Sequence, residues 1–174
     1  MKPLAYLQGF PPALLAQVQA LVDAGRLGAH VAARYPEQHT VRSDRALRHY
    51  VEALKAEHLR NAEPLSQVAF DNHLHVVHHA LGTHTTVSRV QGSRLKSKRE
   101  LRVASVFKQA PAAFLRMIVV HELAHLKERD HGKAFYALCT HMEADYHQLE
   151  FDTRLWLTAR VLEGGKSQAL SPGA

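Results

Sequence analysis

An apolar run that leads straight into a pair of histidines is the feature that most constrains how this chain can fold. The run FLRMIVV, residues 114–120, follows Pro111 and predicts a buried helix over residues 111–127. His121 and His125 come directly after the run, so they share one helix face and lie about 6 Å apart along its axis. Two imidazoles at this separation can bind one metal ion. The helix is therefore predicted to carry two ligands of a metal site.

Glu122 stands beside the first of these histidines and completes the pattern HExxH. Because a glutamate at this position can reach a water held by the ion, it is the expected general base. A core in which these side chains only hydrogen-bond is one competing interpretation, and a noncatalytic zinc site is another. Unsatisfied polar groups beside the apolar run would cost about 1–3 kcal/mol each, which argues against the first. Glu122 argues against the second, since a purely structural site does not need it.

The third ligand requires this helix to end. His131 follows His121 by ten residues, and on an unbroken helix it would lie about 15 Å further along, out of reach of the same ion. The segment LKERD has no apolar continuation after its leucine, Asp130 is suited to cap a new helix, and Gly132 can bend the backbone. We therefore predict a turn that returns His131 to the metal.

A rival for the third ligand is Glu143, which follows His125 by 18 residues on the next predicted helix. We favour His131 because its return needs only one turn. An acidic residue could instead orient a liganding ring from behind, the candidates being Glu143, Asp130 and Asp145. Three later residues could stabilise a developing negative charge if their helix folds over the site, namely His141, Tyr146 and His147.

Helical and strand-like patterns alternate along the rest of the chain, which predicts the α+β class, with helices packed on a short, mostly antiparallel sheet. Helical spacing between Pro11 and Gly25 indicates one helix, and Ser43 can cap a second that runs to about Arg60. Alternating or β-branched segments predict strands, and two later apolar patterns predict helices. The strands are 67–71, 83–90 and 100–107, a short helix is 73–82, and the later helices are 132–142 and 147–162.

Length and composition predict a single globular domain. The chain has 174 residues, 46% of them hydrophobic and 22% charged, which leaves neither a fibrous nor a disordered class. We expect the domain to span residues 1–162, with the helices in 11–62 as scaffold, and residues 163–174 to form a disordered tail. The one cysteine, Cys139, excludes an intramolecular disulfide. With neither a membrane helix nor an export signal expected, the predicted location is the cytoplasm.

Basic residues gather in one predicted loop, residues 89–102, in a chain whose formal net charge is +6. The loop carries six cations, which are Arg89, Arg94, Lys96, Lys98, Arg99 and Arg102. Such side chains could hold phosphate groups. A solvated basic loop that binds nothing is the plainer interpretation.

Nearly the whole chain resembles the YgjP-like metallopeptidase-domain family, a family of short HExxH metal-dependent hydrolases. The resemblance is carried by the HELAHL core with His131 and Phe135, and it extends to the segments HQLEFDTRLWL and YLQGFP. It implies a small zincin-like fold whose central helix bears His121, Glu122 and His125. It also implies His131 as the third metal ligand.

Three functions are consistent with this sequence. We favour a zinc metallopeptidase, in which neutral imidazoles leave the ion its full charge, the ion activates water, and Glu122 accepts the proton; another divalent metal could replace zinc. Residues 101–107 could pair with an extended peptide or protein substrate. The alternative is a metal-dependent nucleotide pyrophosphohydrolase that uses loop 89–102 for the phosphates. The third is a nucleic-acid-associated protein with a structural metal, weakly bound through the same loop.

Overall fold

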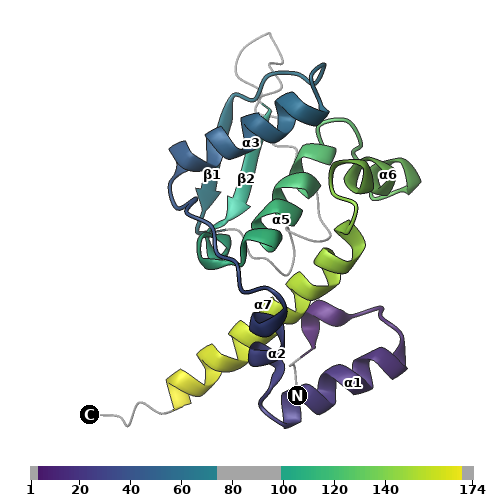
Figure 1. Ribbon diagram of the computed structural model, residues 1–174, viewed down its shortest axis with the longest axis vertical. Coiled ribbons are helices and arrows are strands. Elements are labelled where there is room, and N and C mark those ends of the chain that lie inside the picture. The colour runs from purple at the N-terminus through teal and green to yellow at the C-terminus, as the bar shows by residue number, and fades with distance from the viewer. Residues whose placement is uncertain (1–3, 74–98, 170–174) are drawn as a thin grey trace. The chain divides into compact units, whose positions relative to one another are not determined.

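The computed structural model describes residues 4–73 and 99–169, and it belongs to the α+β class (Figure 1). Two compact units divide the chain: residues 1–36 with 148–174 form one, and residues 37–147 form the other. No helix of the described part is long and apolar enough to span a bilayer. The single domain predicted for residues 1–162 stays a prediction.

The first unit is helical. It contains the 3₁₀ helix η1 (Ala5–Leu7), α1 (Pro12–Asp23), α2 (Leu27–Arg34) and, from residue 148 on, α7 (Tyr146–Ala169). The predicted helix between Pro11 and Gly25 is confirmed as α1. Gly25 has φ +65°, a conformation that glycine adopts without steric cost, and the next amide donates to Leu21 O at 2.9 Å to close the helix end. Helix α7 continues to Ala169, into the segment expected to be disordered, and disorder of that tail stays a prediction.

The second unit holds α3 (Asp44–His58), β1 (Gln67–Asp71), β2 (Glu100–Ala104), the 3₁₀ helix η2 (Ser105–Gln109), α5 (Ala112–Ala124) and α6 (Lys133–Met142). Helix α3 packs against β1, and α5 packs against β2 (Figure 1). Ser43 caps α3 as predicted, because its Oγ accepts a hydrogen bond from Ala46 N at 3.2 Å.

The sheet corrects one prediction. Strands β1 and β2 are parallel, with Val68 opposite Leu101 and Phe70 opposite Val103, whereas a mostly antiparallel sheet was expected. Parallel neighbours need a long crossover rather than a hairpin. Residues 72–99 connect the two strands. Residues 74–98 lie outside the described part of the chain, and with them the predicted strand 83–90 and most of the predicted helix 73–82.

Strand β2 is shorter than predicted, because the chain turns into η2 at Ser105 instead of continuing as a strand to Phe107. Phe107 is fully buried, and its carbonyl accepts a hydrogen bond from His39 Nε2 at 2.9 Å. The amide of Ala112 also donates to Glu37 O at 2.9 Å. These contacts hold the start of α5 against the segment that precedes α3.

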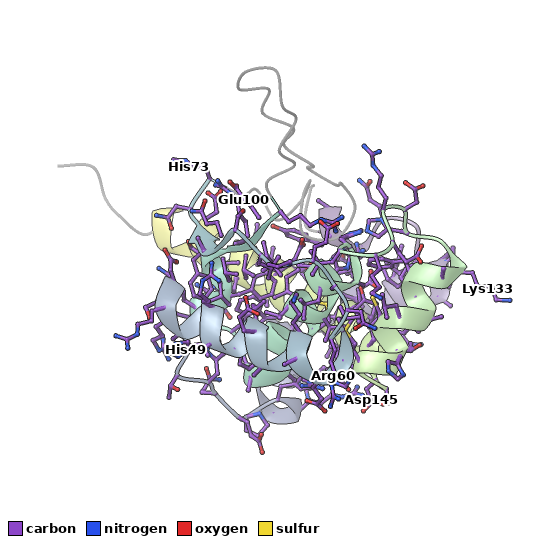
Figure 2. All side chains as sticks on the ribbon, turned by 90° about the horizontal axis from the view of Figure 1, so that it is seen from above. His49, Arg60, His73, Glu100, Lys133 and Asp145 are labelled. Carbon is purple, nitrogen blue, oxygen red and sulfur yellow. The ribbon has the colours of Figure 1, made fainter. Side chains whose placement is uncertain are left out.

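Helix α5 is the centre of the core of this unit. Eight of its hydrophobic side chains are at most 1% exposed, which are Phe114, Leu115, Met117, Ile118, Val119, Val120, Leu123 and Ala124. Burial on nearly every side fits the continuous apolar run in the sequence. In contrast, His49 on α3 and Lys133 at the start of α6 point outward into solvent (Figure 2). The segment from His125 to His131 therefore directly follows a buried helix.

Candidate metal centre

Three imidazole nitrogens converge at the end of α5. The Nε2 atoms lie 3.2 Å apart for His121 and His125, 3.3 Å apart for His121 and His131, and 3.0 Å apart for His125 and His131. Ligands held at about 2.0–2.1 Å by a tetrahedral ion lie about 3.3–3.4 Å from one another. The three rings therefore fit the spacing of a metal site with three protein ligands and an open fourth position. In the described part of the chain, no other group of three possible ligands meets this test.

The helix break that brings the third ring back has a simple local cause. Helix α5 ends at Ala124, and His125 occupies its C-cap position, so the chain leaves the helix immediately after the second histidine. Turn hydrogen bonds follow, and the amide of Gly132 donates to Asp130 O at 2.8 Å. The predicted turn is confirmed. The predicted cap is wrong: Gly132, with an extended backbone, is the N-cap of α6, and Asp130 lies two residues earlier.

Two of the rings are oriented by partners behind them. His125 Nδ1 lies 2.9 Å from Glu128 O, and because a carbonyl can only accept, this nitrogen carries the proton and leaves Nε2 with a lone pair. His121 Nδ1 lies 2.7 Å from the hydroxyl of Tyr146. Partners of this kind fix both the tautomer and the direction of a liganding imidazole.

Phe135 forms an apolar support for all three rings. Its ring centroid lies 5.0 Å from that of His121, 4.5 Å from that of His125 and 4.8 Å from that of His131. The side chain is fully buried. Phe135 follows His131 by four residues and lies in the first turn of α6, and this nearness in sequence could have indicated the contact.

Glu122 is partly exposed by surface area, and yet the protein around it excludes enough water that burial raises the pKa of its carboxyl from 4.5 to about 8. A dication held by the neighbouring rings favours the carboxylate again, because an opposite charge lowers the pKa. Glu122 therefore stands in surroundings where it can exchange a proton near neutral pH.

The other acidic candidates lie apart from the three nitrogens. Glu143, the rival third ligand, pairs with Arg116, whose Nε lies 2.5 Å from Glu143 Oε2. Asp130 and Asp145 are exposed, and the Asp145 amide donates to Glu143 Oε1 at 3.3 Å. The structure therefore groups His131 with the first two histidines and assigns Glu143 to an ion pair.

The three residues considered for charge stabilisation lie in different surroundings. Tyr146 is fully buried behind His121, on the side of the ring away from the converging nitrogens. His141 is exposed and its ring lies 5.8 Å from that of His58, while the ring of His147 lies 5.3 Å from that of Tyr136. The Tyr146 hydroxyl therefore lies against Nδ1 of His121 and not beside the converging Nε2 atoms.

Two cations of the basic loop, Arg99 and Arg102, lie in the described part of the chain, and both contact other groups. Arg99 pairs with Glu63 at 2.6 Å and donates to Leu126 O at 2.7 Å, in the turn that follows α5. Arg102 pairs with Asp71 at 2.8 Å and with Glu100 at 3.0 Å. The other four cations of loop 89–102 lie outside the described residues.

Comparison with known proteins places the chain in a family. The model of the "YgjP-like, metallopeptidase domain" family matches residues 28–154. A UTP pyrophosphatase of Escherichia coli (strain K12) is 61% identical over 166 residues, which cover 95% of this chain and 99% of that protein. No protein of solved structure matches the chain. The chain therefore belongs to the YgjP-like metallopeptidase-domain family.

Proposed function

We propose that this chain is a metal-dependent nucleotide pyrophosphohydrolase, which hydrolyses a nucleoside triphosphate such as UTP to the monophosphate and pyrophosphate. One observation carries the proposal: three converging imidazole nitrogens with a glutamate beside them lie in a chain that is 61% identical to a UTP pyrophosphatase. Both the family and this relative support metal-dependent hydrolysis. The relative favours a phosphate substrate over the peptide that the sequence alone led us to prefer.

The three histidines and Glu122 have separate roles in the proposed reaction. His121, His125 and His131 would hold a divalent ion, which supplies electrophilic activation of water and of a phosphate oxygen. Glu122 accepts the proton of the attacking water. The water oxygen forms a bond to the α-phosphorus, and the bond between that phosphorus and the oxygen bridging to the β-phosphorus breaks. The electron pair leaves with pyrophosphate, and Glu122 can return the proton to it.

Phosphate recognition needs cations that are not already neutralised. Arg99 and Arg102 are held in ion pairs with acidic residues, so they are poor candidates for binding a triphosphate. The sequence offers four further cations in the same loop, which are Arg89, Arg94, Lys96 and Lys98. We propose that phosphate contacts from this loop come from these four.

A zinc metallopeptidase is the second candidate, because the family carries that description and the same three nitrogens with a glutamate would serve carbonyl chemistry. Binding of nucleic acid around a structural metal has no comparable support. The metal itself stays open, since imidazole nitrogens suit zinc and also other transition metals.

Turnover by wild type and Glu122→Gln separates these candidates. Both proteins are loaded with zinc, manganese or magnesium and tested on the four common nucleoside triphosphates and on a panel of unfolded proteins. We expect wild type to release equal amounts of nucleoside monophosphate and pyrophosphate, and Glu122→Gln to lose about 10²- to 10⁴-fold in rate because the general base is gone.

A matched control makes the same carboxylate-to-amide change elsewhere. Glu52 lies on α3 in an exposed pair with Arg48, so Glu52→Gln should turn over UTP like wild type. Cleavage of proteins without turnover of any nucleotide would overturn the proposal in favour of a peptidase. Equal nucleotide turnover by Glu122→Gln and wild type would refute the role of Glu122.

A further inference from the structure

The hydroxyl of Tyr146 contacts the buried side of His121, at the ring nitrogen that faces away from the other two histidines. It is the first residue of α7, its side chain is fully buried, and its Oη lies 2.7 Å from His121 Nδ1. The two rings are nearly parallel, at 21°, with centroids 6.4 Å apart. His121 itself is only 3% exposed, so water has little access to the same nitrogen.

The turn that delivers Tyr146 is fastened to the helix that carries His121. Arg116 on α5 binds Glu143 through Nε at 2.5 Å and Met142 O through Nη2 at 2.9 Å. Glu143 is the C-cap of α6, and its carbonyl accepts a hydrogen bond from the Tyr146 amide at 3.0 Å. Arg116 and His121 lie on the same rigid helix. The ion pair therefore fixes the distance between the start of α7 and the imidazole.

We propose that Tyr146 is a positioning residue for the metal ligand His121, and that the Arg116–Glu143 ion pair acts through it. The inference rests on the metal-binding part of the proposed function. A hydroxyl at this place holds the proton on Nδ1 and the ring in one orientation, so that Nε2 presents its lone pair to the ion. Without the hydroxyl, the buried N–H loses its hydrogen bond to Tyr146 and the ring is less well fixed.

Tyr146→Phe tests the first part, because it removes one oxygen and keeps the ring. We expect the affinity for Zn²⁺, measured by competition with a chromophoric chelator, to fall about 10- to 100-fold. The visible absorption of the Co²⁺-loaded protein should change as well, since it reports the ligand geometry. Tyr6→Phe is the matched control: it makes the same chemical change in η1, outside the unit that holds the site, and should keep wild-type affinity.

Glu143→Gln and the double variant test the second part. If the ion pair acts through Tyr146, Glu143→Gln should weaken Zn²⁺ binding by less than Tyr146→Phe. The double variant should then bind Zn²⁺ like Tyr146→Phe alone, because the ion pair can no longer act through the missing hydroxyl. Unfolding of each protein without metal, followed in urea, shows whether the variants remain folded.

The outcomes are distinct. Wild-type affinity in Tyr146→Phe, or losses that add in the double variant, would overturn the inference and leave the proposed function standing. Tight Zn²⁺ binding with no hydrolysis of nucleotides would overturn the proposed function and leave the inference standing. Failure of wild type to bind any divalent metal would remove both.

Discussion

At the scale of single residues, the site depends on groups that surround the three imidazoles as well as on the imidazoles themselves. Phe135 contacts all three imidazole rings, and Tyr146 and Glu128 hold two of them from behind. We infer that these neighbours preorganise the site, so that less of the binding free energy is spent on ordering it.

Phe135→Leu tests this at the position that touches every ring. The smaller side chain leaves part of the support empty, so we expect unfolding to become easier by about 1–3 kcal/mol and Zn²⁺ affinity to fall as well. Urea unfolding without metal measures the first effect, and chelator competition measures the second.

Phe107→Leu is the control for Phe135→Leu, because Phe107 is also fully buried but lies in η2 rather than in α6. It should lose similar stability and keep the affinity of wild type. If both variants lost metal affinity equally, general loosening of the core would explain the effect, and the specific role of Phe135 would be refuted.

At the scale of elements, the start of α5 is held by a histidine that must stay neutral. His39 accepts a hydrogen bond from Val41 N through Nδ1 at 3.0 Å, so its Nε2 carries the proton and donates to Phe107 O. Burial lowers the pKa of His39 below its ordinary value of 6.5; the Phe107 carbonyl raises it in part, and Arg42 lowers it further. The His39 ring can therefore make both hydrogen bonds only in its uncharged form.

The pH dependence of stability follows from this shift. A lowered pKa in the folded state means that the stabilisation is complete above the ordinary pKa of 6.5 and is lost as pH falls through that value toward the lowered one. Unfolding free energies of wild type and His39→Gln, measured in urea between pH 8 and pH 5, should differ most at the alkaline end and converge on acidification. A constant difference across this range would contradict the prediction.

Elements with local signals could be predicted from the sequence, whereas their partners could not. The Ser43 cap, the start after Pro11 and the glycine that follows α1 depend on a few adjacent residues, and the structure confirms them. The direction of β2 relative to β1 depends on the connecting residues 72–99, and no pattern within either strand encodes it.

The same distinction applies to the site. The convergence of His121, His125 and His131 follows from their spacing and from the end of the helix before His131. Both can be predicted from adjacent residues in the sequence. Pairing of Glu143 with Arg116 follows from folding of two distant segments, 27 residues apart, as does the bond between Tyr146 and His121. Spacing made Glu143 a possible ligand and charge made Arg99 a possible phosphate contact, and the structure gives each an ion-pair partner.

At the scale of the whole molecule, α7 begins at Tyr146 in one compact unit, and from residue 148 on it belongs to the unit that contains residues 1–36. The residue that orients His121 is thus the first residue of a helix shared by both units. A single cooperative domain is the expectation that follows from sequence length.

Metal removal tests both the site and this cooperativity. A ligand that binds only the folded state, present at 100 times its dissociation constant, stabilises by about 2.7 kcal/mol, which corresponds to about 5–10 °C in melting temperature for a chain of this size. Calorimetry of wild type should therefore show one transition that moves upward with Zn²⁺ and returns when a chelator is added. Glu122→Gln, which keeps all three imidazoles, should show the same shift, and His131→Ala should show little of it. Two transitions, of which only one responds to Zn²⁺, would refute the single domain while supporting the metal centre, because binding stabilises only the unit that folds around the ion.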